Sequence, residues 1–276
     1  MEIFNSPVWY AFLLASFAGL STGIGSAIAF FAKRTNTKLL SVALGFSAGV
    51  MVYISFVEIF QGARSTLIEH YGNFKGLLIT IISFFGGMAL IGLIDKFVPS
   101  FENPHEMGKL EDMEDVSQAR SFRKLYRLGI FTALAIAIHN FPEGLATFVA
   151  ALNDPTIGLA IAIAIAIHNI PEGIAVSIPI YYATSSHKKA FFYSFLSGLA
   201  EPIGALIGYL LILPFLSKEN ADIFFGIILS GVAGIMVFIS FDELLPSAEE
   251  YGEHHLSLYG LLGGMAVMAI SLLYIA

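Results

Sequence analysis

Long apolar runs separated by short polar connections make up most of this chain. A membrane-spanning helix needs about 20 mostly apolar residues. Eight runs are long enough, and they lie at residues 8–31, 39–60, 76–95, 128–151, 157–182, 190–213, 222–245 and 256–275. The pattern therefore predicts an all-α membrane protein with eight transmembrane helices, in which residues 1–276 form a single transmembrane domain.

One connection is long and polar, and it lies at residues 100–127. Lys and Arg residues favour the cytoplasmic side of a membrane protein. Eleven of them lie in the connections that follow the first, third, fifth and seventh runs, against three on the other side. We therefore expect residues 100–127 to form a polar cytoplasmic loop, and both termini to lie outside the cell.

The chain also repeats itself in a consistent order. The matched segments are SAGVMVYISFVE (47–58) with VAGIMVFISFDE (232–243), FFGGMAL (84–90) with LLGGMAV (261–267), and more weakly AGLSTGIGSAIA (18–29) with SGLAEPIGALIG (197–208). Runs one to three thus correspond to runs six to eight, and run four corresponds to run five. Both shifts are odd, so each copy crosses the membrane in the opposite direction. Such an inverted repeat is typical of secondary transporters, whose sites lie near the bilayer midplane.

The fourth and fifth runs carry the most specific motif, IAIHNFPEGL (136–145) and IAIHNIPEGI (165–174). Each helical residue turns about 100°, so His139, Asn140 and Glu143 share one helix face. The second copy repeats this face with its own His, Asn and Glu, at His168, Asn169 and Glu172. Two such faces can enclose two cation sites that share both carboxylates, one rich in His and Glu and the other in Asn and Glu.

The prolines and glycines of the motif indicate a kinked, hydrated region. Pro142 and Pro171 have no N–H, so each leaves the carbonyl four residues earlier without its helical partner. In lipid that group needs another partner or water, while Gly144 and Gly173 permit close backbone approach. A lone buried His or Asn often serves only helix packing. A carboxylate at mid-membrane costs about 2.5–3.5 kcal/mol, however, and two matched copies favour a cation site.

Further carboxylates interrupt other runs. Glu201, in GLAEPIG, aligns with Thr22, so the repeat is broken at this ionisable position. We expect Glu201 to be a ligand of one site only, the alternative being a carboxylate that caps a broken helix. Glu58 and Glu243, with Asp242 beside the latter, lie near span ends and are either interfacial carboxylates or relays at the two mouths of a pathway.

Composition supports a membrane environment and narrows the chemistry. Hydrophobic residues make up 57% of the chain and charged residues 13%, whereas a soluble domain carries about 25% charge. The net charge of -7 disfavours nucleic acid as a partner. The chain has no cysteine, so imidazole and carboxylate are the available ligands, and these suit Zn²⁺ or Fe²⁺.

The paired motifs, the eight runs and GLAEP resemble the ZIP (Zrt/Irt-like) family of metal transporters. The resemblance implies a transporter domain that brings zinc across the plasma membrane into the cytoplasm, with iron, manganese, cobalt or cadmium as further cargo, and no cofactor. It implies a two-metal centre in which His168, Glu143 and Glu172 hold zinc, with His139 as an additional contact. The second site, associated with Fe²⁺, would be held by Asn140, Asn169, Glu143, Glu172 and Glu201. The sequence is compatible with both a monomer and a homodimer.

Two other functions fit parts of the pattern. An intramembrane zinc metallohydrolase would also use His and Glu four residues apart. However, the chain has no HExxH sequence, and every candidate carboxylate is already used as a ligand. A proton-coupled carrier of another solute would use His and Glu as a proton relay. Hydrolysis of a substrate would support the first alternative and metal-independent transport the second, and we expect no enzymatic activity.

Overall fold

The computed structural model describes residues 7–28, 37–97, 113–153, 155–212, 218–250 and 254–275, and their regular secondary structure is entirely helical. The elements are α1 (Pro7–Ile28), α2 (Thr37–Ile54), η3 (Ser55–Ile59), α3 (Phe60–Phe97), α4 (Met113–Asn153), α5 (Pro155–Thr184), α6 (His187–Gly198), α7 (Ala200–Ile207), η5 (Gly208–Ile212), α8 (Lys218–Ile239), η7 (Ser240–Leu244), α9 (Leu245–Glu250) and α10 (His254–Ile275). The predicted all-α class is therefore confirmed over this part of the chain.

Seven helical segments in the described residues are long and apolar enough to cross a membrane. One of them, at residues 37–96, is 60 residues long and contains two of the predicted runs. Within it, Gly72 has a φ of 76° and breaks the helical path of α3, a conformation that glycine adopts without a side-chain clash. The protein is a multi-pass membrane protein, and helix length gives seven spans where the sequence predicts eight.

The predicted polar loop at residues 100–127 is partly helical. α4 already begins at Met113 and continues without interruption into the membrane-spanning part of the helix. Residues 98–112, with the loop's His105, lie outside the described part of the chain. The loop is therefore shorter at its C-terminal end than the hydrophobic pattern predicts, because polar residues extend α4 beyond its apolar run.

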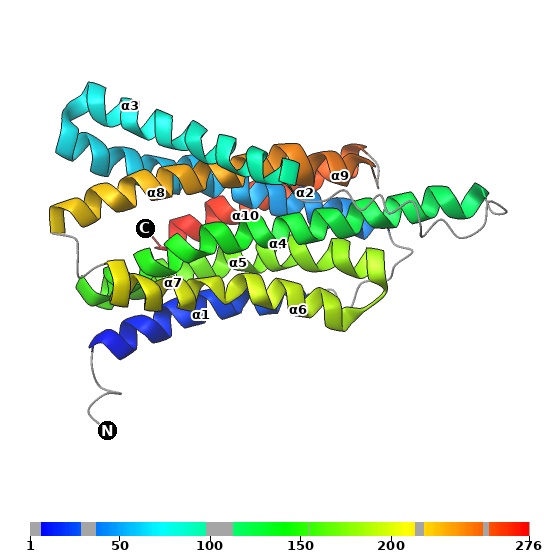
Figure 1. The fold of residues 1–276 in the computed structure, drawn as a ribbon, viewed down its shortest axis with the longest axis horizontal. Helices are drawn as coiled ribbons and strands as arrows, with labels where there is room; N and C mark the ends of the chain where they lie inside the picture. The colour runs from blue at the N-terminus through cyan, green and yellow to red at the C-terminus, as the bar shows by residue number, and fades with distance from the viewer. Residues whose placement is uncertain are drawn as a thin grey trace.

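The helices form two groups that meet along α4 and α5 (Figure 1). α3 packs on α8 and α2 on α10, while α1 and α4 both pack along α5, and α7 packs on α4. Buried side chains from α2, α4, α5 and α8 share one core cluster, among them Met51, Ile136, Ile178 and Met236. Large apolar side chains such as Ile82 and Phe85 are exposed, as expected for a surface that faces lipid.

The two copies of the longest repeated segment make matching contacts. A Cβ at Gly49 would collide with the carbonyl of Leu261, and a Cβ at Gly234 would collide with the carbonyl of Phe84. Gly49 aligns with Gly234, and Phe84 aligns with Leu261, in the repeated sequences. The α2–α10 and α8–α3 interfaces therefore use equivalent positions, and glycine permits the close backbone approach in both.

Both copies also leave α-helical geometry at the same place. The segments SFVEI and SFDEL form the short π-helices η3 and η7. The Ser55 hydroxyl donates to the Met51 carbonyl at 2.6 Å, and the Ser240 hydroxyl donates to the Met236 carbonyl at 2.8 Å. π-Helical turns are rare and occur frequently at functional sites, and here each one carries a carboxylate at the same position, Glu58 or Glu243.

Candidate metal centre

The two HNxPEG motifs face each other across the interface of α4 and α5. His139 Nε2 lies 2.8 Å from Glu172 Oε1, and His168 Nε2 lies 3.3 Å from Glu143 Oε2. Each imidazole thus pairs with the carboxylate of the other helix. All four side chains are at most 3% exposed, so two reciprocal His–Glu pairs lie within the buried interior.

The asparagines and Glu201 lie beside these pairs, toward α1, α6 and α7. Asn169 donates through Nδ2 to the Ala18 carbonyl at 2.8 Å and also to Glu201 Oε1. Asn140 donates to the Ser197 carbonyl at 3.4 Å. Ala18 and Ser197 are equivalent positions of the repeat. The structure therefore joins Asn169 to Glu201 directly, whereas no such carboxylate stands at the equivalent position, Thr22.

Serine hydroxyl groups and glycines pack the neighbouring helices against α4 and α5 near the prolines of the motifs. Ser47 of α2 donates to the Pro171 carbonyl at 2.8 Å, and the Ser21 hydroxyl of α1 lies 2.9 Å from the Ala166 carbonyl. These hydroxyl groups bind the α5 carbonyls of Ala166 and Pro171, and neither is the carbonyl of Ile167, which Pro171 leaves without its helical partner. A Cβ at Gly144 would collide with the Glu201 carbonyl, so glycine lets α7 approach α4 at the level of the motif.

Several polar atoms of the centre have no hydrogen-bond partner among the described residues. They include Asn140 Oδ1, Asn169 Oδ1, Glu172 Oε2, Glu201 Oε2 and His168 Nδ1. A buried polar atom without a partner costs about 1–3 kcal/mol. Four of these five atoms are oxygens, and oxygen and imidazole nitrogen together form a donor set that suits a divalent cation.

A cavity of about 770 Å³ reaches this centre from one end of the molecule. Glu143 and His168 line it on the α4–α5 side, and residues of α2, η3, α3, α8 and α10 line the opposite side. Two further carboxylates, Glu58 and Asp222, belong to its lining. Sequence reasoning singled out Glu58 but missed Asp222, because one acidic residue at the start of a run has no distinguishing pattern.

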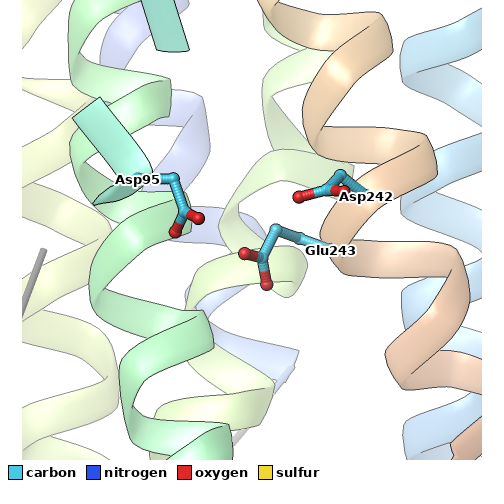
Figure 2. Close-up of side chains that lie close together, drawn as sticks. All are labelled: Asp95, Asp242 and Glu243. Atoms are coloured by element: carbon cyan, nitrogen blue, oxygen red, sulfur yellow. The ribbon is translucent and has the colours of Figure 1, made fainter. Parts of the chain in front are cut away.

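A second group of carboxylates lies where the C-terminal end of α3 meets η7. Figure 2 shows Asp95 of α3 facing Asp242 and Glu243 of η7, and one oxygen from each lies within 4.8 Å of the others. Arg127 of α4 binds Asp95 at 2.7 Å, and Asp242 is exposed. Asp95 was not singled out from the sequence, since nothing local connects it with residues almost 150 positions away.

The arrangement is that of a multi-pass membrane protein with a buried set of His, Asn and Glu side chains between two proline-containing helices. The family model described as ZIP Zinc transporter matches residues 100–272. A protein named zinc transporter ZupT from Oceanobacillus iheyensis is 62% identical over 96% of this chain and 98% of its own length. Proteins of that name from Clostridium perfringens and Streptococcus mutans are 60% and 59% identical, over 96% and 98% of this chain and the same shares of their own lengths.

This chain therefore belongs to the ZIP zinc transporter family. The resemblance seen in the paired motifs is confirmed by similarity over nearly the whole chain. The expectation of a transporter rather than an enzyme is confirmed with it, because the relatives are named as transporters.

Proposed function

We propose that this protein carries zinc across the membrane into the cytoplasm through a two-metal site between α4 and α5. The observation that carries the proposal is the reciprocal pairing of His139 with Glu172 and His168 with Glu143 in the buried interior. The adjoining oxygen atoms without partners and the cavity that reaches Glu143 support it. The relatives named zinc transporter ZupT indicate the cargo.

The ligands divide between two sites that share the carboxylates Glu143 and Glu172. His168, assisted by His139, completes the first site with nitrogen ligands. The second site is richer in oxygen and is completed by Asn140, Asn169 and Glu201. Zinc favours the first set because it accepts imidazole nitrogen readily.

The protein accepts Fe²⁺, Mn²⁺, Co²⁺ and Cd²⁺ as secondary cargo in this proposal. Sites with nitrogen and oxygen ligands bind several divalent metals, and the selectivity among these metals depends on the geometry of the site and on the availability of each metal. The absence of cysteine from the chain supports release of these ions as well as binding, since no thiolate can hold them.

The chain crosses the membrane eight times as an inverted repeat. Support comes from contacts that equivalent positions of the two copies make in the same way. The contact of Gly49 with Leu261 corresponds to that of Gly234 with Phe84, and the His139–Glu172 pair corresponds to the His168–Glu143 pair. The break at Gly72 separates the second crossing from the third. The Lys and Arg distribution then places both termini outside the cell and the connection at residues 100–127 in the cytoplasm.

Uptake of ⁶⁵Zn into proteoliposomes that contain the purified protein tests the proposal. We expect saturable uptake that excess unlabelled Zn²⁺ suppresses strongly and that Fe²⁺ or Mn²⁺ suppresses more weakly. Protein-free liposomes and a Glu143→Gln/Glu172→Gln variant of equal melting temperature are the controls. Uptake that equals these controls would contradict zinc transport.

A further inference from the structure

The cavity that reaches the metal centre has walls that are mostly apolar. Ile54, Val57, Ile161, Phe225 and Leu229 are among its lining residues. Its described lining contains three carboxylates, Glu58, Asp222 and Glu143, and no Lys or Arg. An apolar wall of low dielectric strengthens the field of such charges and raises the local concentration of cations.

We propose that Glu58 and Asp222 form an outer capture site that holds a hydrated divalent cation before it reaches Glu143 and His168. This inference rests on the proposed transport function. The cavity connects the two levels, because the same space is lined by Glu58 and Asp222 and by the buried pair His168–Glu143. His168 is 2% exposed and its Nδ1 has no partner among the described residues, so a buried ligand atom lies beyond the carboxylates.

The local structure of η3 sets Glu58 in this lining. η3 is a π-helical turn at Ser55–Ile59, and Val57, Glu58 and Ile59 all line the cavity. Glu58 is exposed, so its carboxylate is accessible to an ion that enters the cavity.

Asp222 has no acidic counterpart in the repeat. It aligns with Thr37, whereas Glu58 aligns with Glu243. The second carboxylate therefore does not follow from the repeated architecture. It lies in the first turn and a half of α8 (Lys218–Ile239), which packs against η3, so it adds a second carboxylate to the side of the cavity that faces Glu143 and His168.

The test measures zinc uptake by cells that lack other zinc importers, with free Zn²⁺ buffered in the medium. Glu58→Gln and Asp222→Asn should each raise the KM for zinc by about 3- to 10-fold, with the maximum rate per transporter unchanged. Glu58→Asp should restore the KM. The matched control is Glu69→Gln, which removes one exposed carboxylate near the same end of the molecule, outside the cavity lining.

Raised ionic strength should increase the KM of the unmodified protein more than that of the double variant Glu58→Gln/Asp222→Asn, because salt screens the capture site. An unchanged KM in both single variants, or a fall in maximum rate at constant KM, would overturn the inference. KM does not depend on the amount of protein, so lower expression of a variant leaves the result readable. No zinc uptake by the unmodified protein would instead contradict the proposed function itself.

Discussion

At the scale of single residues, the centre consists of two imidazole–carboxylate pairs and a set of amide and carboxylate oxygens. Each pair joins α4 to α5, so the carboxylates are stabilised in the absence of metal by hydrogen bonds from the opposite helix. In the proposed function, a cation that enters would displace the protons that hold these pairs together, because metal ligands must be deprotonated to bind. The same side chains would then stabilise the protein without metal and bind the proposed cargo.

Replacing either shared carboxylate should stop transport. We expect Glu143→Gln and Glu172→Gln each to lose nearly all zinc uptake, because each residue serves both sites. Glu201→Gln is the matched comparison, since it serves only the second site, and it should retain zinc uptake and lose mainly the competition by Fe²⁺. Initial ⁶⁵Zn uptake per protein measures this, with melting temperature as the control for folding. Normal uptake in either shared-carboxylate variant would contradict the two-site arrangement.

Much of the centre could be predicted from the sequence because the helical period fixes which motif residues share a face. The spacing of the motif and its second copy were sufficient to predict His139, Asn140 and Glu143 as members of the centre. The partner of Asn140 at the Ser197 carbonyl, and the positions of Asp95 and Asp222, depend on how distant helices pack. No local pattern encodes that packing, so these features appear only in the structure.

At the scale of elements, close helix packing depends on which glycine of a pair faces the neighbour. A Cβ at Gly87 would collide with the Gly231 carbonyl, whereas a Cβ at Gly86 would have no neighbouring atom within 4 Å. The second copy behaves in the same way: Gly264 faces the Phe46 carbonyl and Gly263 faces open space.

Alanine at these adjacent glycines should therefore have opposite consequences. We expect Gly87→Ala and Gly264→Ala each to destabilise the protein by about 1–3 kcal/mol, because overpacking forces the backbones apart. Gly86→Ala and Gly263→Ala should be neutral or slightly stabilising, because alanine favours helices over glycine. Thermal melting in detergent, followed by size-exclusion chromatography, measures the difference. Equal effects within a pair would show that the helices pack on another face.

The boundaries of the elements were harder to predict than their existence. The apolar runs locate the spans, but the polar first part of α4 has no hydrophobic signal and yet is helical from Met113. The sixth run is divided, because α6 ends at Gly198 and α7 begins at Ala200, just before Pro202. The second and third runs follow each other in one helical stretch at residues 37–96, which leaves helical geometry at Gly72.

At the scale of the whole molecule, the proposed topology places the Gly72 turn and the start of α8 at one end. On the opposite side of the molecule this topology places the α5–α6 connection and both termini of the segment at residues 37–96. The chain has no native cysteine, so single cysteines can report the side of each position without background labelling.

Impermeant thiol reagents applied to intact cells should label Asn73→Cys and leave Lys38→Cys, Lys96→Cys and Lys188→Cys unlabelled until the cells are opened. All four positions are exposed. Labelling of Lys38→Cys and Lys96→Cys from opposite sides would contradict two crossings within residues 37–96, and with them the count of eight. The zinc uptake of each variant controls for correct insertion.

Anomalous diffraction at the zinc absorption edge, from crystals of the zinc-loaded protein, measures most directly where the cargo binds. The predicted result is a peak between α4 and α5, within coordinating distance of His168, Glu143 and Glu172, that disappears in Glu143→Gln/Glu172→Gln crystals. A zinc peak confined to other positions, such as Asp95 and Asp242, with none between α4 and α5, would contradict transport through the paired motifs.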